Sequence, residues 1–90
     1  MLSLVGSTQF KRDMKRAQKR GKDLKKLRKL VGLLLEQRAL SATYKDHPLR
    51  GNWNGYRDVH IEPDWLLIYK VSGTELHLAR TGTHSDLFEE

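Results

Sequence analysis

The sequence predicts an α+β domain in which two N-terminal helices pack on a twisted, mainly antiparallel sheet, in the order β-α-α-β-β-β. Apolar residues of the first half recur at helical spacing, whereas the second half contains short segments that alternate between apolar and polar residues. A long segment with Gly, Pro and Asn separates the two halves. A chain of 90 residues is the length of one small domain, and we expect residues 1–90 to form a single unit.

The N-terminal part predicts a short strand followed by a helix. Leu2 and Leu4 alternate with polar or small residues, as in a half-buried strand. Ser7 or Thr8 can cap a helix, and Gly21 supplies its end. These signals place the first helix immediately after the first strand.

A second helix should follow at Asp23, which can cap it. Because two or three residues join the helices, they should form an antiparallel hairpin. The apolar stripe of the second helix, which should face the core, consists of Leu24, Leu27, Leu30, Val31, Leu34 and Leu35.

The two helices carry most of the positive charge. Residues 11–30 hold 11 of the 17 Lys and Arg and two acids, which gives this segment +9 in a protein of net charge +6. A basic block of this kind is typical of a surface that binds a polyanion or an acidic protein. A pair of solvated helix faces is the alternative, and the one-sidedness of the charge favours a binding surface.

The second half predicts a long loop and a meander of three strands. Residues 41–55 contain Pro and several Gly and Asn, and a loop of this length commonly serves binding or catalysis. Strands are expected at Tyr56–Glu62, Trp65–Val71 and Leu76–Thr81, the second being buried on both sides. A tail that contains a helical turn should follow.

Several chemistries are excluded by composition. The chain has no cysteine, so it can form neither a disulfide nor a zinc–thiolate site. The histidine spacings match no compact metal motif, and a metal site or other cofactor is not expected. Because no stretch resembles a secretory signal or a membrane span, we expect a cytoplasmic protein that does not contact a membrane.

Titratable residues of the second half sit where a rigid sheet usually presents working side chains, in a loop, at a turn and at a strand end. Strict alternation predicts that Arg80 shares a face with Leu76 and Leu78, and it cannot show whether Arg80 and the histidines share a face. Each residue alone has an ordinary surface explanation, and the set is what indicates a site. Its members are His47, His60, Asp64, Arg80 and His84.

This set suits RNA cleavage. RNA supplies its own nucleophile, the 2′-hydroxyl, so an enzyme needs a base, an acid and a cation near the scissile phosphate. Histidine can serve as acid or base near neutral pH, and arginine matches phosphate oxygens in a bidentate manner. Aromatic side chains can hold an unstacked base.

Three motifs in sequence order resemble the YafQ-type toxins of the RelE/ParE superfamily. The first is the run from Tyr44 to Leu49, and the second is the run from Gly55 to Trp65. The third joins Arg80-Thr81-Gly82-Thr83-His84 to Leu87-Phe88, and the run Ala17-Gln18-Lys19-Arg20 is similar as well. The resemblance covers almost the whole chain.

The resemblance implies a RelE-like fold and ribosome-dependent cleavage of messenger RNA, which stops translation. It implies a DinJ/RelB-like antitoxin that blocks the toxin and carries the DNA-binding part, so that operator DNA is contacted through the antitoxin. The ribosome, with its RNA, and the messenger are the other partners. The family's working residues match His47, His60, Asp64, Trp65, Arg80, His84 and Phe88.

Within this resemblance, we expect His84 to act as general acid and His60 or Asp64 as base, with His47 orienting or sharing that role. Arg80 would stabilise the charged phosphorane, while Trp65 and Phe88 position the nucleotide. Two other functions compete: a ParE-like inhibitor of gyrase, which needs no histidine set, and a non-catalytic basic RNA- or DNA-binding module.

Overall fold

The computed structural model describes residues 1–88, which form three α-helices, five strands and two short 3₁₀ turns. The helices are α1 (Thr8–Lys19), α2 (Leu24–Leu35) and α3 (His84–Phe88), and the 3₁₀ turns are η1 (Ala42–Tyr44) and η2 (Gly51–Trp53). The strands are β1 (Ser3–Gly6), β2 (His47–Pro48), β3 (Arg57–Glu62), β4 (Trp65–Ser72) and β5 (Glu75–Gly82).

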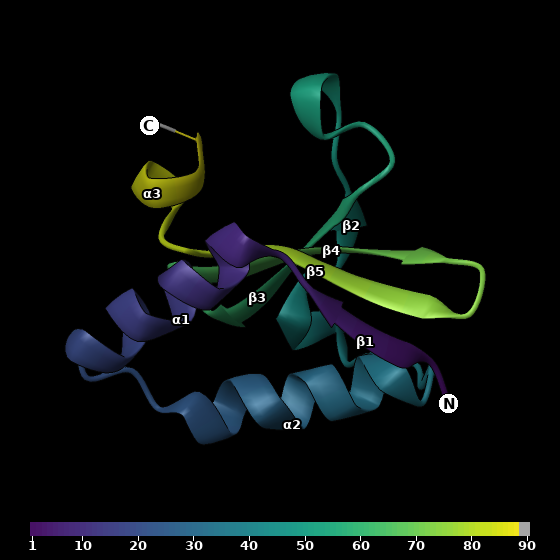
Figure 1. The fold of residues 1–90 in the computed structure, drawn as a ribbon, viewed down its shortest axis with the longest axis horizontal. Coiled ribbons are helices and arrows are strands. Elements are labelled where there is room, and N and C mark those ends of the chain that lie inside the picture. The colour runs from purple at the N-terminus through teal and green to yellow at the C-terminus, as the bar shows by residue number, and fades with distance from the viewer. Residues whose placement is uncertain (89–90) are drawn as a thin grey trace.

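The five strands form one sheet in the order β1-β5-β4-β3-β2. All neighbours are antiparallel except β1, which pairs in parallel with β5. Figure 1 shows α2 below the sheet, whereas α3 and the η2 segment stand above it. The predicted α+β architecture, with its meander of the last three strands, is therefore confirmed.

The segment between α2 and β3 is more ordered than a plain loop. Residues 41–55, predicted to be irregular, contain both 3₁₀ turns, and between them β2 pairs with β3 through His47 and Asp58. A two-residue strand has no alternation to detect in a sequence, which explains why the pattern missed it.

Both long helices end in the same hydrogen-bonded motif. After α1, Gly21 adopts a positive φ of 78°, and the N–H groups of Gly21 and Lys22 donate to the carbonyls of Gln18 and Ala17. This pattern is a Schellman motif, which glycine enters without strain. At the end of α2 a non-glycine residue, Gln37, takes the same left-handed conformation.

The sheet separates two apolar clusters. The larger lies against α1 and α2, and it includes Leu30, Val59 and Trp65. The smaller lies on the opposite face, where Leu66 and Ile68 of β4 pack against Leu87 of α3. Since β4 is the middle strand and is buried on both faces, its nearly continuous apolar sequence is explained. We call the face opposite α1 and α2 the open face.

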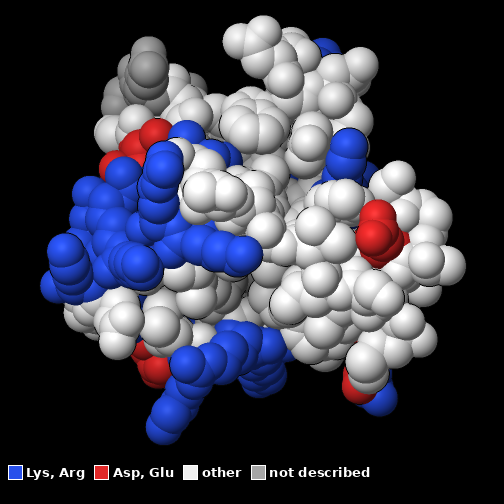
Figure 2. All heavy atoms as spheres, viewed as in Figure 1, with Lys and Arg blue, Asp and Glu red and all other residues white. Residues whose placement is uncertain are grey.

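Positive charge gathers on the two long helices. Figure 2 shows Lys and Arg spread over α1 and α2, while the side of the molecule near β1 is mostly uncharged. We call the Lys- and Arg-rich surface of α1 and α2 the basic face. Its exposed members are Lys11, Arg12, Lys15, Lys19, Arg20, Lys25, Lys26, Arg28 and Lys29. Within residues 1–88, none of the helices has the length and hydrophobicity needed to cross a bilayer.

Helix α1 completes the free edge of β5. Strand β1 pairs with β5 only as far as Leu78, so the backbone groups beyond that residue lack a strand partner on this side. Ser7 donates its hydroxyl to the carbonyl of Ala79 (2.7 Å), and the Asp13 carboxylate accepts the N–H of Thr81 (3.1 Å). Buried backbone groups need such partners, so α1 is fixed to the strand end by hydrogen bonds as well as by packing.

Asp13 also binds two cations. The Asp13 side chain is 1% exposed. Its carboxylate accepts hydrogen bonds from Nε of Arg80 at 2.8 Å and from Arg16 at 3.1 Å. A buried charge is tolerated only when it is paired and hydrogen-bonded, and this carboxylate meets both conditions.

We predict that Asp13→Ala lowers the free energy of unfolding by about 3 kcal/mol, because it leaves the Thr81 N–H and part of the Arg80 guanidinium without a partner. Urea denaturation of the variant and of the parent would measure the loss. The matched control is Asp23→Ala, which removes only the exposed cap of α2 and should cost about 1 kcal/mol. Equal small losses in both variants would contradict the structural role given to Asp13.

Candidate active site

A β-bulge determines where Arg80 points. Strand β4 pairs Tyr69 with Leu78 but Ile68 with Arg80, so Ala79 is an extra residue in β5. The strict alternation that predicted Arg80 on the face of Leu78 is therefore wrong. The bulge turns Arg80 to the open face, opposite Ile68.

The bulge places Arg80 in one row across the sheet with His47 and Asp58. His47 pairs with Asp58, Asp58 with Ile68, and Ile68 with Arg80, across four neighbouring strands. Residues directly opposite each other in antiparallel strands share a face, so this row lies on the open face. His60 lies on the same face, two residues further along β3. The sheet thus gathers residues that are up to 33 positions apart in the sequence.

Three histidines form a continuous cluster at the β3 side of this face. The ring centroids of His47 and His60 are 6.4 Å apart, and those of His60 and His84 are 5.6 Å apart. His60 is the middle member, while His84 reaches the cluster from the first position of α3. Two imidazoles at this separation can approach opposite sides of one phosphodiester group.

His84 is held by Asp64 at the β3–β4 turn. One carboxylate oxygen of Asp64 accepts from the backbone N–H of His84 at 2.9 Å and contacts Nδ1 of its ring at 2.6 Å. These two hydrogen bonds, the backbone one above all, hold the pKa of Asp64 below its ordinary value. With Nδ1 used by the carboxylate, Nε2 of His84 is the nitrogen left for a substrate.

His47 is held by the loop that carries it. Its Nδ1 donates to the carbonyl of Lys45 at 2.7 Å, so Nδ1 bears the proton and Nε2 of the neutral ring is an acceptor. The neighbouring Asp46 fixes the loop to the sheet, because it accepts hydrogen bonds from Arg57 (3.1 Å) and from the Tyr69 hydroxyl (2.8 Å). An exposed histidine is thereby given a defined orientation.

Asp58 is a member of the site to which the sequence analysis gave no role. It is 3% exposed, and its Oδ2 lies 3.7 Å from Nε2 of His47. Its Oδ1 is buried and has no hydrogen-bond partner among residues 1–88. Burial raises the pKa of Asp58, although the three histidines oppose this effect. Its position two residues before His60 was the available signal, since i and i+2 share a strand face.

Arg80 lies apart from the histidine cluster. Strand β4 separates it from Asp58, which corresponds to a backbone separation of about 10 Å across two strand spacings. The bond from its Nε to Asp13 raises the pKa of Arg80 further, so the guanidinium is permanently charged. Arg80 borders a hollow of about 400 Å³ between η2 and α3, together with Asn52, Trp53, Asp86, Leu87 and Phe88.

The structure therefore brings His47, His60, Asp64 and His84 together, and it places Phe88 with Arg80 across the central strand. A second hollow, of about 450 Å³, lies beside His60. It arises because β2 is only two residues long and leaves the outer edge of β3 uncovered beyond Asp58. An extended strand of RNA crossing the open face would meet both groups.

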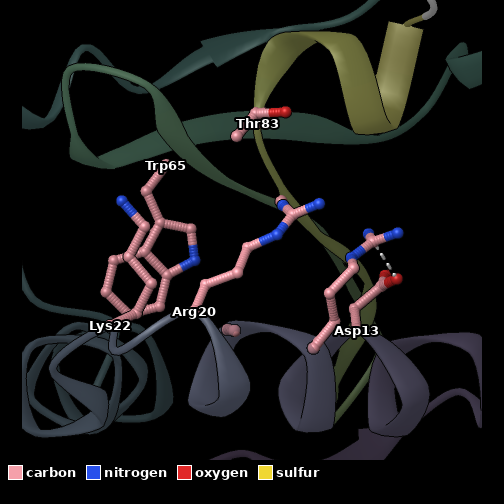
Figure 3. A pocket seen from close by; sticks show the side chains of 8 residues that line it. Asp13, Arg20, Lys22, Trp65 and Thr83 are labelled. Carbon is pink, nitrogen blue, oxygen red and sulfur yellow. Dashed lines mark hydrogen bonds and ion pairs between the residues drawn. The ribbon is translucent and has the colours of Figure 1, made fainter.

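Trp65 does not lie on this face. It is 1% exposed, and its indole N–H donates to Thr81 at 3.0 Å on the side of α1 and α2. Figure 3 shows it on the wall of a small pocket beside Arg20 and Lys22, whose Nζ is 5.8 Å from the ring centroid. That pocket holds about 10 Å³, enough for one water molecule and too little for a base. A stacking role requires an open ring face, so the expectation that Trp65 positions the nucleotide is not supported.

Comparison with known families agrees with the fold. The class is that of small bacterial toxins, because residues 2–89 match the family described as bacterial toxin of type II toxin–antitoxin system, YafQ. The chain belongs to this YafQ family.

Named relatives are similar over nearly the whole chain. The mRNA interferase toxin YafQ of Escherichia coli K12 is 55% identical over 83 residues, which are 91% of this chain and 90% of the relative. The solved E. coli DinJ–YafQ complex contains a chain that superposes with a TM-score of 0.90 at 52% identity, covering 98% of this chain and 99% of that one. A metal-bound toxin from Helicobacter pylori superposes with a TM-score of 0.92 at 43% identity, covering 98% of this chain and 100% of that one.

We predict that Asp58→Asn stabilises the protein at neutral pH. Because the pKa of Asp58 is raised on folding, its contribution to stability is complete below the ordinary value of 3.8 and is lost as the pH rises through the raised value. The amide mimics the protonated carboxyl and avoids that loss. Thermal unfolding at pH 4 and pH 8 should show a higher midpoint for the variant at pH 8 and a smaller difference at pH 4.

The control is Glu36→Gln, an exposed acid at the end of α2, which should not gain stability at pH 8. A variant Asp58→Asn that is less stable than the parent at pH 8 would show that the charged carboxylate stabilises the fold.

Proposed function

We propose that this chain is the toxin of a type II toxin–antitoxin system and an endoribonuclease that cuts messenger RNA on the ribosome, in the cytoplasm. The observation that supports this function most directly is the cluster of three imidazoles on the open face, one of them bonded to Asp64. Membership of the YafQ family and similarity to a protein named mRNA interferase support the same function. A gyrase inhibitor or a passive RNA-binding module would need no such cluster.

In the proposed reaction, the 2′-oxygen of the RNA attacks the neighbouring phosphorus, and the bond from phosphorus to the 5′-oxygen breaks. His60, with His47 sharing the role, takes the 2′-proton, while His84 gives a proton to the departing 5′-oxygen. The products are a 2′,3′-cyclic phosphate and a free 5′-hydroxyl. The H. pylori toxin is described as metal-bound. Every step proposed here uses groups of the chain itself, without a metal ion.

The hydrogen bonds support this division of roles. Asp64 accepts twice from His84, which fixes the ring through Nδ1 and leaves Nε2 as the nitrogen that can deliver a proton. Asp64 is thus engaged with the acid, which favours His60 over Asp64 as base. His47 presents Nε2 as an acceptor because its Nδ1 is bound to Lys45.

Arg80 and Phe88 would act from the other side of β4. We assign Arg80 to a phosphate of the bound strand, where its fixed charge offsets the charge that develops on phosphorus. Asp13 holds the guanidinium through Nε and one terminal nitrogen, which limits its motion. Phe88 can stack on a base in the hollow that it shares with Arg80.

We predict that His84→Gln lowers the single-turnover rate of cleavage on programmed ribosomes by about 10² to 10⁴, the usual contribution of one acid or base. Ribosome binding should be unchanged, because the substitution leaves the Lys and Arg of the basic face in place. The measurement is mapping of 3′-ends of a message with time at saturating toxin.

The matched control is His77→Gln, at a histidine that contacts Glu75 and lies outside the cluster, which should cleave at the parent rate. Equal cleavage by His84→Gln would remove His84 from the mechanism. A parent protein that leaves the message intact and inhibits gyrase supercoiling would instead support the ParE-like alternative.

The basic face is the proposed contact for ribosomal RNA, the antitoxin or both. The E. coli relative has been solved with DinJ, so we infer a DinJ/RelB-like antitoxin for this chain, with operator DNA bound through that partner. A surface of exposed Lys and Arg attracts RNA phosphates at long range and releases counterions when they bind.

We predict a steep salt dependence of ribosome binding that becomes shallower when the basic face loses charge. Replacing Lys25 and Lys29 by Ala should lower the magnitude of the slope of log K against log salt by about one for each phosphate that is no longer neutralised. The control is Arg38→Ala, which removes an exposed cation paired with Glu36 at the far end of α2. A slope that is flat in the parent protein would show that the basic face does not bind phosphates.

A further inference from the structure

The hollow between η2 and α3 contains two residues that the proposed reaction does not use, Asn52 and Trp53. Its volume of about 400 Å³ is within the range of small-ligand sites in proteins. Its lining combines two aromatic rings, a cation, an acid and an amide, from η2, β5 and α3. This mixture suits a nucleotide better than an apolar ligand.

The ring of Trp53 contacts one neighbouring ring and packs against the apolar cluster of the open face. Its ring contacts Tyr56 edge-on, with centroids 5.3 Å apart and an interplanar angle of 84°. Tyr56 is in turn covered by the ammonium of Lys70 at 4.8 Å. Trp53 is half-buried. The ring is therefore positioned by its neighbours and still borders the hollow.

The η2 turn is built to stand away from the sheet. Gly51 and Gly55, on either side of Trp53, have φ angles of 65° and 93°, which other residues rarely adopt. They bring Asn52 into an exposed position at the rim of the hollow, where its amide can both donate and accept.

The opposite wall and the floor complete a nucleotide-sized site. Phe88 of α3 supplies a second aromatic ring, and Arg80 supplies the charge. Asp86 is already engaged, because its carboxylate binds Arg20 at 2.6 Å and the N–H of Thr83 at 3.0 Å. Arg80 binds Asp13 through Nε and Nη2, so Nη1 is the nitrogen with which it can bind a phosphate in this hollow.

We propose that Asn52 and Trp53, with Phe88 opposite, form the pocket for a base next to the scissile phosphate, and that Asn52 reads the edge of that base. The inference rests on the proposed nuclease function and adds the residues that decide base preference. Stacking is tolerant of sequence because every base has a π face, whereas an amide at the rim distinguishes patterns of donors and acceptors. The competing role for Trp53 is that of an apolar cover over Leu66 and Ile68, which belong to the same cluster.

The first test measures binding without cleavage. The chain has two tryptophans, and since Trp65 is 1% exposed, only Trp53 is open to quenching by a stacked base. The probes are 2′-O-methyl trinucleotides of different sequence, which lack the nucleophile. Saturable quenching in the parent protein, weakened about tenfold or more in Phe88→Ala, is the expected result. Absence of quenching by every trinucleotide would overturn the pocket.

The second test measures cleavage on ribosomes programmed with varied codons. Trp53→Ala should lower the single-turnover rate at saturating toxin by about tenfold to a hundredfold, with an unchanged pH profile because the histidines are intact. Trp53→Phe should retain most of the activity. Asn52→Ala should broaden the base preference, while the matched control Asn54→Ala, an exposed residue of the same turn that does not line the hollow, should leave it unchanged.

The outcomes separate this inference from the nuclease function. If the parent protein cleaves and both Asn52→Ala and Trp53→Ala keep its rate and base preference, the pocket is overturned while the nuclease stands. If the parent protein does not cleave, the nuclease function fails, and the quenching experiment alone decides whether the hollow binds a base. Should Trp53→Ala unfold, Trp53→Phe and Asn52→Ala carry the test.

Discussion

The carboxylate of Asp13 is the constraint on which the arrangement of the open face depends. It joins α1 to the free edge of β5 by accepting the N–H of Thr81, and it accepts a hydrogen bond from Nε of Arg80. Without this acceptor, the end of β5 would have an unpaired edge and a mobile cation, and α3 follows directly from that strand end. The orientation of Arg80 and the place of the strand end from which α3 continues therefore both depend on one buried carboxylate.

The helices and the long strands could be predicted because their signals are local. The cap at Ser7, the end at Gly21 and the apolar stripe of α2 each lie within a few residues of one another. The parallel pairing of β1 with β5 had no local signal, since it joins the two ends of the chain. The bulge at Ala79 was also hidden, because an extra residue looks like normal alternation until the partner strand is known.

The candidate site could be predicted from the sequence only in part, because strand pairing has no local signal. His47, Asp64 and His84 were candidates because of their places in a loop, at a turn and at a strand end, and His60 because of its strand face. Their convergence depends on pairing between β2, β3 and β4. Trp65 was misjudged because its motif and aromatic character indicated stacking, whereas its face is decided by which side α1 and α2 cover. The burial of Asp58 and the hollow beside Trp53 could not be predicted, because burial and cavities are properties of the folded chain.

The bulge in β5 also determines which changes of this strand end keep the guanidinium on the open face. Regular pairing at unchanged length would place Ala79 opposite Ile68 and return Arg80 to the side of Leu76 and Leu78. Deletion of Ala79 would instead remove the bulge and keep Arg80 opposite Ile68. Among homologous chains, this strand end should therefore occur either with the extra residue and a bulge, or one residue shorter with regular alternation.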